Sequence, residues 1–401
     1  MNQIITEPKI IDDFISRRLD KIVPNKEELK TRLMSGKKLR LYQGFDPSSP
    51  NLHIGHLVGL LTLKAFQDLG HEVIFLIGDF TGMIGDPSGK SQARNVTSLE
   101  FTQKNAQTYR EQAGKILRFE GDNPILIKFN SEWNNKLDFA GVINLATHFT
   151  VQQMIERDMF QERFKKNQEV YLNEFLYPLT QGYDSVAMEV DLEVGGTDQL
   201  FNMLAGRKLL KELKGIDKLV VTTPLLADSS GNKIGKTEGN AINITNPPEQ
   251  LYGQMMSLPD SAIMPCFKLI TQIPSEQLPE VEEKVKTDPM AAKKHLAWEL
   301  TKMLNDEAAA NKAQEHFEKT VQGGANPDEI AEFTPSTYTP LTILAILGEA
   351  ELISSNSEGK RLIEQNAVKI DDQVVNDPNQ VIELKSGMVI KAGKRKFVRV
   401  K

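Results

Sequence analysis

The segment LRLYQGFDPSSPNLHIGHLVGLLTLKAFQDLGHEVIFLI spans residues 39–77 and predicts one complete supersecondary unit. Apolar runs at 39–45 and 73–77 predict strands that are buried on both faces, and 57–69 predicts the helix between them. A strand, a turn, a helix and a second strand form a βαβ unit, whose first turn is a common phosphate site. The start of the helix offers free backbone N–H groups and a partial positive charge. The segment therefore predicts a nucleotide site on a parallel α/β sheet.

The first turn of this unit carries His53-Ile54-Gly55-His56. Two imidazoles add hydrogen-bond donors without a fixed charge, and Gly55 lets a ligand approach the backbone closely. The two histidines could instead bind a metal ion or cap the helix. The zinc-protease pattern needs a spacing of four with a glutamate between, and this turn has neither. We interpret the turn as a phosphate-binding element.

The whole chain has 401 residues, too many for one ordinary domain, and its 40% hydrophobic and 25% charged content is typical of a globular protein. The net charge of −6 gives no general indication of nucleic-acid binding. Cys266 is the single cysteine, which excludes an internal disulfide and a cysteine-built metal site. No apolar run approaches the roughly 20 residues of a membrane helix, and the N-terminus does not resemble a signal peptide. We expect a cytoplasmic protein with no membrane partner.

Strand and helix patterns alternate over the first half of the chain, which predicts an α/β fold with a Rossmann-type parallel sheet. The further strands are predicted at 125–129, 190–194 and 219–222, and the further helices at 9–35 with a break at Pro24, 99–119, 135–165, 172–183 and 195–213. Only helical patterns occur from Pro248 to Gln322, and Asp288-Pro289 and Asp306 have the residue types that begin helices. Two glycines and three prolines at 323–340 predict a linker.

These patterns predict five segments. They are a Rossmann-type catalytic domain at 1–227 with an inserted helical segment, a mobile lysine-containing loop at 228–245, an all-helical domain at 246–322, a linker at 323–340 and a small α+β domain at 341–401. The last of these has ten basic and eight acidic residues, and six of the final eleven residues are Lys or Arg. Such a tail suits contacts with nucleic-acid phosphates, although a solvated charged terminus is the alternative.

Two further stretches carry lysines that could reach a polyphosphate. Gly78 to Arg94 reads as a glycine-rich loop, and its part Gly85–Ser91 resembles a Walker A motif, but it has three residues between the glycines instead of four. We expect an exposed loop that brings Lys90 and Arg94 toward phosphates, with a plain solvated turn as the alternative. Lys233-Ile-Gly-Lys236-Thr237 places two lysines around a glycine in a polar stretch. Its significance depends on being paired with the histidine turn.

That pairing resembles a known enzyme family. His-Ile-Gly-His matches the first signature of class I aminoacyl-tRNA synthetases, and Lys-Ile-Gly-Lys-Thr is similar to their second, Lys-Met-Ser-Lys-Ser, with both lysines kept and three positions changed. The chain resembles bacterial tyrosyl-tRNA synthetases over nearly its whole length. The matching pieces are Leu41–Pro47, Gly82–Lys90, Tyr177-x-x-x-Gln181-x-x-Asp184, Gly195–Gln199 and, in a tail similar to an S4-type RNA-binding domain, Gly359–Ile363, Val368–Ile370 and Gly393–Phe397.

The resemblance implies a role for each matching residue. For the substrate tyrosine, Tyr42 and Asp184 are implied to bind the phenol, Asp86, Tyr177 and Gln181 the α-amino group, and Gln199 the carboxylate. For ATP, the implied contacts are Asp46, Ser48, His53, Gly55, His56, Gly196, Asp198 and Lys236. The implied contacts with the leaving pyrophosphate are Lys90, Arg94, Lys233, Lys236 and Thr237.

Simple chemistry agrees with several of these roles. Tyr177, Gln181 and Asp184 are spaced by four and three residues, so one face of a helix presents all three. An anionic Asp86 suits an ammonium group. If Tyr42 and Asp184 are buried and bind a phenolic hydroxyl, they reject phenylalanine, because its ring leaves both without a hydrogen-bond partner. Taken alone, Asp184 could be a carboxylate on a helix face and Tyr177 a core aromatic.

The resemblance implies a tyrosine–tRNA ligase. The carboxylate of L-tyrosine attacks the α-phosphate of ATP, and the adenylate then acylates tRNA(Tyr); positioning and charge stabilisation carry the catalysis, with Mg²⁺ on the ATP phosphates and no protein-bound metal. A homodimer is implied, for which 135–165 could supply the interface. Three alternatives stay open. They are a tryptophan-specific synthetase, another nucleotidyltransferase with this histidine turn, and an RNA-binding protein on a decayed synthetase scaffold.

Overall fold

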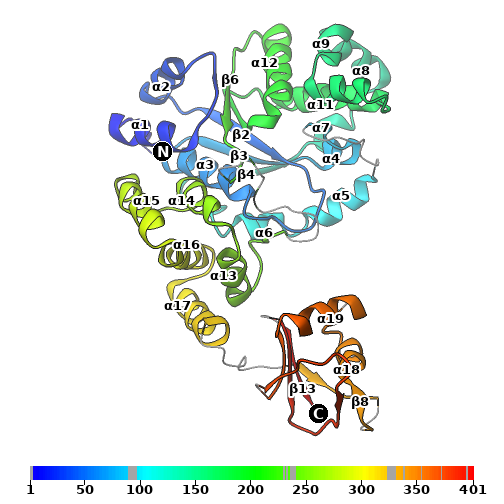
Figure 1. The fold of residues 1–401 in the computed structure, drawn as a ribbon. Coiled ribbons are helices and arrows are strands. Elements are labelled where there is room, and N and C mark those ends of the chain that lie inside the picture. Colours follow the sequence, from blue (N-terminus) through cyan, green and yellow to red (C-terminus); the bar gives the residue numbers. More distant parts are fainter. Residues whose placement is uncertain are drawn as a thin grey trace. The chain divides into compact units, whose positions relative to one another are not determined.

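The structure is a computed structural model of the 401-residue chain. It describes residues 3–88, 97–228, 231, 234, 241–322, 331–336, 339–353, 355–371, 373–393 and 396–401. The chain divides into two compact units, Met1–Ala310 and Asn311–Lys401 (Figure 1). None of the helices in the described ranges is long and apolar enough to cross a membrane.

A six-stranded sheet forms the centre of the first unit. Its strands, in spatial order, are β1 (Ile22–Val23), β6 (Leu219–Thr223), β5 (Leu192–Gly196), β2 (Arg40–Phe45), β3 (Glu72–Ile77) and β4 (Leu126–Phe129). All neighbours are parallel except β1, which runs antiparallel to β6. The predicted parallel α/β fold is therefore confirmed, while the short edge strand β1 was not predicted because it lies in a stretch with helical spacing.

The order in which successive strands are added to the sheet reverses between β2 and β5. From β2 the chain continues outward to β3 and then β4, and it returns to β5 on the other side of β2 before continuing to β6. Phe45 at the end of β2 pairs with Ile77 at the end of β3, so these carboxyl ends lie level. In open parallel sheets, the crevice beyond the carboxyl ends at such a reversal is where ligands bind.

Helices cover this sheet (Figure 1). The helices before β5 are α1 (Pro8–Arg18), α2 (Lys26–Met34), α3 (His56–Asp68), α4 (Asp79–Ile84), α5 (Leu99–Ala106), α6 (Tyr109–Ala113), α7 (Ser131–Asn134), α8 (Phe139–Ala146), α9 (Val151–Ile155), α10 (Asp158–Lys165) and α11 (Leu172–Met188). After β5, a 3₁₀ turn at Thr197–Gln199 leads into α12 (Leu200–Lys214). The helix predicted at 57–69 is thus present within one residue at each end.

Three predictions of local structure were wrong in detail. The single helix predicted at 99–119 is divided into α5, which ends at Ala106, and α6, which covers Tyr109–Ala113. The glycine-rich stretch from Gly78 contains the short helix α4, whose first residue Asp79 accepts a hydrogen bond from the Ser131 hydroxyl at 2.6 Å. The single helix predicted at 135–165 is divided into α8, α9 and α10. Asp138 and Thr150 each accept a backbone N–H three residues ahead, and these side-chain caps start new helices where the apolar spacing alone suggested continuity.

The stretch after the sheet is helical, as predicted. It contains α13 (Pro248–Met256), α14 (Ile263–Ile270), α15 (Leu278–Thr287), α16 (Pro289–Leu304), α17 (Glu307–Phe317) and a π-helical turn at Glu318–Gln322. Asp288 caps α16 and Asp306 caps α17, each by accepting a backbone N–H three residues ahead. Two neighbouring arginines of α1 attach this region to the first residues of the chain. Arg17 and Arg18 donate to backbone carbonyls in and just after the last turn of α14.

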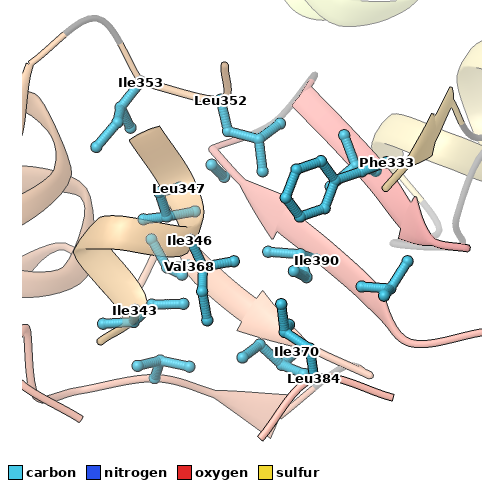
Figure 2. Close-up of a cluster of buried hydrophobic side chains, with 14 of the residues drawn as sticks. Phe333, Ile343, Ile346, Leu347, Leu352, Ile353, Val368, Ile370, Leu384 and Ile390 are labelled. Carbon is cyan, nitrogen blue, oxygen red and sulfur yellow. The ribbon is translucent and has the colours of Figure 1, made fainter. Parts of the chain in front are cut away.

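The second unit is a small α+β unit. It contains β7 (Ala331–Phe333), β8 (Leu341–Thr342), α18 (Ile343–Glu349), α19 (Asn356–Glu364), β9 (Val368–Ile370), β10 (Gln373–Val374), β11 (Val381–Ile382), β12 (Val389–Ala392) and β13 (Lys396–Val400). Figure 2 shows its core, in which Ile346, Val368 and Ile390 are fully buried. The predicted linker at 323–340 needs correction, because β7 pairs in parallel with β13 and Phe333 joins this core. The alternating pattern of β7 covers three residues, which is too short for sequence alone to distinguish a strand from a linker.

Candidate active site

A cavity of about 400 Å³ opens at the carboxyl ends of β2 and β5, where the strand order reverses. Most of the sequence-predicted site residues line it together, although they come from five separate parts of the chain. They are Tyr42, Asp46, Ser48, His53, Gly55, His56, Asp86, Tyr177, Gln181, Asp184, Gly196, Asp198 and Gln199. The other five, Lys90, Arg94, Lys233, Lys236 and Thr237, lie outside the described residues.

The histidine turn presents two neutral donors to this cavity. The Nδ1 atom of His56 accepts the backbone N–H of His53 at 3.0 Å, and the Nδ1 atom of His53 accepts the backbone N–H of Gly55 at 3.1 Å. Since each Nδ1 is an acceptor, each neutral ring carries its proton on Nε2. The ring centroids lie 4.0 Å apart at the start of α3. Two N–H donors and a helix N-terminus therefore converge, which suits an anionic oxygen.

Gly55 is required by the packing of this turn. A Cβ atom added at this position would lie 2.9 Å from Cε1 and 3.0 Å from Nδ1 of His53. Its backbone dihedrals are ordinary helical values, so the constraint is space and not conformation. Any side chain here would displace the His53 ring.

One residue of the second lysine motif and the stretch that follows the motif lie next to the histidine turn. Ile234, the second residue of the motif, donates its backbone N–H to Leu226 at 2.8 Å and lines the cavity, and its carbonyl oxygen would lie 3.9 Å from a Cβ atom added to Gly55. Downstream, Ile242 accepts the backbone N–H of Ile54 at 2.9 Å, and Ile244 donates to Leu52 at 3.0 Å. The described residues on either side of Lys236 thus bracket the turn.

Asp184 is the acceptor at the closed end of the cavity. Its side chain is 2% exposed, and its carboxylate accepts hydrogen bonds from Trp133 Nε1 at 2.7 Å, Asn134 Nδ2 at 3.1 Å and Asn130 Nδ2 at 3.2 Å. Burial raises the pKa of Asp184 to about 8, against the opposing effect of these three donors. Tyr42 lines the same end, is 1% exposed, and its hydroxyl lies 2.9 Å from Ser185 Oγ; burial raises its pKa.

Carboxylates line the open part of the cavity as well. Asp46 accepts the hydroxyl of Thr81 at 2.7 Å and that of Tyr177 at 2.8 Å. Asp86 accepts Gln199 Nε2 at 2.6 Å and the backbone N–H of Ser88 at 2.9 Å. The Tyr177 hydroxyl is therefore directed at Asp46, and the resemblance did not indicate this contact. Two carboxylates in one cavity suit a cationic group such as an ammonium.

Sequence reasoning missed the residues that hold the predicted ones in place. Asn130, Trp133 and Asn134 follow β4, and polar residues after the end of a parallel strand are a signal that could have been used. Glu193 is a second missed residue. It lines the cavity from within β5, and a lone acid in an otherwise apolar strand was the available signal. Its buried partner Lys218 gave no comparable signal, because a lysine just before a strand is usually solvated.

The chain is similar to known proteins over most of its length. Residues 34–322 match the family model for class I tRNA synthetases (W and Y). A tyrosine–tRNA ligase from Salinibacter ruber is 43% identical over 395 residues, which cover 96% of this chain and 95% of that protein. The corresponding ligase from Thermotoga maritima is 44% identical over 380 residues, which cover 94% of each chain. Among solved structures, a C-terminally truncated mitochondrial tyrosyl-tRNA synthetase from Aspergillus nidulans shares the fold, with a TM-score of 0.65 at 22% identity over 77% of this chain and 93% of that one.

Proposed function

The chain belongs to the class I tRNA synthetase family for tryptophan and tyrosine, and on that premise we propose that it ligates L-tyrosine to tRNA(Tyr). The observation that most directly supports tyrosine as the amino-acid substrate is the composition of the closed end of the cavity. Asp184 and Tyr42 line it together, deep in the protein, and both are suited to a hydroxyl group. A phenol satisfies this end, whereas the indole of tryptophan carries its donor on the ring and has no hydroxyl.

The first proposed step joins tyrosine to ATP. The tyrosine carboxylate attacks the α-phosphorus, the bond to the β-phosphate oxygen breaks, and tyrosyl-adenylate and pyrophosphate form. The attacking group is already an anion, so no general base is needed. Positioning and stabilisation of charge on the phosphate oxygens carry the catalysis. The Nε2–H donors of His53 and His56 are placed for the second of these tasks.

The remaining contacts divide between the two substrates. For tyrosine, Asp86, Tyr177 and Gln181 hold the ammonium, and Gln199 lies near the carboxylate. For ATP, Ser48 and Asp46 lie beyond the end of β2, and Gly196 and Asp198 reach the ribose from the end of β5. Lys90, Arg94, Lys233, Lys236 and Thr237 bind the leaving pyrophosphate. Mg²⁺ binds with the ATP phosphates, since it favours phosphate and water oxygens over an all-protein site.

The second step transfers tyrosine to the terminal ribose of tRNA. The second unit supplies basic side chains to the RNA backbone in this proposal, and Lys391 and Arg399 stand on its neighbouring strands β12 and β13. Removing residues 323–401 tests this role. The cut lies before β7, so no strand of the second sheet is left unpaired. We expect loss of tRNA charging with adenylate formation retained; charging by the shortened chain would exclude the second unit as the RNA anchor.

We propose a homodimer that acts in the cytoplasm, where ATP and tRNA are present. The support is three exposed apolar side chains at the first residues of α8, α9 and α11. Phe139 is 80% exposed, Leu172 is 78% exposed and Val151 is 71% exposed. Large apolar side chains that a monomer would leave in water are typical of a protein–protein interface. Sedimentation of the full chain tests the dimer, and charged substitutions at Phe139 and Leu172 are expected to yield a monomer.

One assay tests the amino acid. Exchange of labelled pyrophosphate into ATP is measured with tyrosine, tryptophan, phenylalanine or no amino acid. We expect exchange with tyrosine alone. Exchange with tryptophan identifies the tryptophan-specific alternative. The absence of exchange with every amino acid identifies a protein without this activity, and either result overturns the proposal.

A further inference from the structure

A fully buried ion pair lies at the cavity, which one of its members, Glu193, also lines. The ammonium of Lys218, just before β6, contacts the carboxylate of Glu193 on β5, and their side chains are 0% and 2% exposed. Taking two charges out of water costs free energy that their attraction regains only in part, so a buried pair of this kind is a weak source of stability. Its partners indicate what else it does.

One set of partners leads to the phenol end. The Lys218 ammonium, which can only donate, lies 2.5 Å from Ser185 Oγ. Ser185 Oγ lies 2.9 Å from the Tyr42 hydroxyl and 3.4 Å from Glu193 Oε2. Because Lys218 occupies a lone pair of Ser185, the serine proton is available for its nearer neighbour, Tyr42. The Tyr42 oxygen then accepts from Ser185, which leaves its own proton for an acceptor, either the Glu193 carboxylate, with which Tyr42 also interacts, or the oxygen of a ligand.

The resulting order of donors matches a phenol. Hydrogen bonds run from the Lys218 ammonium to Ser185, from Ser185 to Tyr42, from Tyr42 to the phenol oxygen, and from the phenol proton to the Asp184 carboxylate. This chain of hydrogen bonds begins at the Lys218 ammonium, which only donates, and ends at the Asp184 carboxylate, which only accepts when it is ionised. A phenol completes it by accepting once and donating once. A phenyl ring leaves the Tyr42 proton and the Asp184 oxygen facing apolar carbon.

The second set of partners leads to the amine end. Gln181 donates its Nε2–H to Glu193 Oε1 at 3.2 Å. This fixes the amide so that Oε1 is directed elsewhere, and that buried oxygen has no hydrogen-bond partner within the part of the chain that the structure describes. Gln181 also lines the cavity. An acceptor held in this orientation suits the ammonium of an amino acid.

The packing of α11 and α12 leaves room for this network. A Cβ atom added to Gly206 would lie 2.8 Å from Lys218 Nζ and 2.9 Å from Ser185 Oγ. Gly206 lies against Gly182, where an added Cβ would meet the Gly206 Cα at 3.3 Å. The two helices therefore cross through glycines at the place where the ammonium and the hydroxyl meet.

We propose that Lys218 and Glu193 are positioning residues that set the hydrogen-bond direction at both ends of the amino-acid pocket, toward a phenol at one end and an ammonium at the other. This inference rests on the proposed tyrosine activation and adds to it the cause of its selectivity. The pair contacts no reacting atom and acts through Tyr42 and Gln181.

Ser185→Ala tests the phenol end with little change in volume and no unpaired charge. We expect the KM for tyrosine in pyrophosphate exchange to rise roughly 3- to 10-fold, the value of one hydrogen bond, with the KM for ATP unchanged. The ratio of kcat/KM for tyrosine to that for phenylalanine should fall by the same factor. Thr301→Val is the matched control, because it removes a buried hydroxyl that bonds its own helix in α16.

Glu193→Gln tests the amine end, because a glutamine there can accept from Gln181 or donate to it. Two inhibitors separate the ends of the substrate: tyramine has the amine and no carboxylate, and 3-(4-hydroxyphenyl)propionate has the carboxylate and no amine. We expect the variant to lose affinity for tyramine relative to the second compound by roughly 3- to 10-fold. If the unpaired lysine unfolds this variant, the double variant Lys218→Met and Glu193→Gln is tested in its place, because it lacks the lysine charge.

The outcomes separate this inference from the function on which it rests. If the unmodified chain shows no tyrosine-dependent exchange, the proposed function is wrong. If it does, and the folded variants keep both the tyrosine-to-phenylalanine ratio and the tyramine preference, the positioning role is refuted. A parallel rise in the KM for ATP also refutes it, because that result shows general distortion of the cavity.

Discussion

Asp184→Asn is the substitution that most directly tests the closed end of the pocket. The two oxygens of Asp184 accept three N–H groups: Trp133 and Asn134 on Oδ1, and Asn130 on Oδ2. An asparagine has one carbonyl oxygen, which best serves the two donors on the Oδ1 side. Its amino group then stands where Oδ2 was, facing the Asn130 amide, which is itself fixed by a bond to Thr81 at 2.9 Å. The site loses its acceptor for the phenol proton.

The size of the effect follows from the chemistry of that lost bond. A hydrogen bond to a charged acceptor contributes about 1.5 to 3 kcal/mol, which corresponds to a loss of tyrosine affinity of roughly 10- to 150-fold. The KM for ATP should be unchanged, since the proposed nucleotide contacts are made by other residues. Pyrophosphate exchange at varied tyrosine and saturating ATP measures this. A variant that melts with the unmodified protein and binds tyrosine equally well would refute the assignment of the phenol to Asp184.

Asp184 should also make the affinity for tyrosine depend on pH, and the Asp184→Asn variant should lose this dependence. Burial holds the pKa of Asp184 at about 8, well above its unfolded value, so the free carboxyl keeps its proton at neutral pH. The phenol donates to the ionised form, and a ligand that prefers the deprotonated site binds more tightly as pH rises toward that pKa. Tyrosine affinity should therefore increase between pH 6.5 and 8, by at most tenfold per unit. Asp184→Asn should show no such increase, and a rise of equal slope in the variant would place its origin in another group.

Three other substitutions probe separate parts of the chain. Gly55→Ala forces the His53 ring away from the Gly55 N–H, and we expect a fall in the rate of adenylate formation of about tenfold or more at an unchanged KM for tyrosine, measured by single-turnover kinetics. Arg18→Ala removes two hydrogen bonds from a guanidinium to carbonyls near the end of α14, at 2.7 and 2.9 Å, and urea titration should show a loss of roughly 3 kcal/mol in the free energy of unfolding. Lys233→Ala and Lys236→Ala should each slow adenylate formation far more than they weaken tyrosine binding, and unchanged single-turnover rates in both variants would exclude the pyrophosphate role.

The sequence predicted the sheet well because its strands are buried on both faces. Continuous apolar runs of five residues, such as Val73–Ile77, cannot remain in water, and their alternation with helices limits the connections to parallel ones. The predictions that were wrong involve short elements. The strand Ile22–Val23 and the strand Ala331–Phe333 are held by pairing with distant strands, β6 and β13, so two or three residues of local sequence could not indicate them.

Polar side chains caused the other differences. The capping carboxylate of Asp138 and hydroxyl of Thr150 divide a segment whose apolar spacing is continuous, and the buried carboxylate of Asp79 holds a helix start in a stretch rich in glycine. Each of these residue types also occurs in ordinary loops. Whether one of them starts a helix depends on which donor lies within about 3 Å of it.

The residues that line the cavity and the residues that orient them differ in how visible they are to sequence reasoning. Tyr177, Gln181 and Asp184 share a helix face, and His53 and His56 share a turn, so spacing alone grouped them. Glu193 and Lys218 are 25 residues apart and meet because β5 and β6 are neighbours in the sheet. Ser185 and Tyr42 join them across 143 residues. A motif can show which groups touch a substrate, but the direction in which each hydroxyl or amide donates is set by partners brought in by the fold. For this reason a substitution behind the pocket, such as Ser185→Ala, can alter selectivity while every residue that contacts the substrate stays the same.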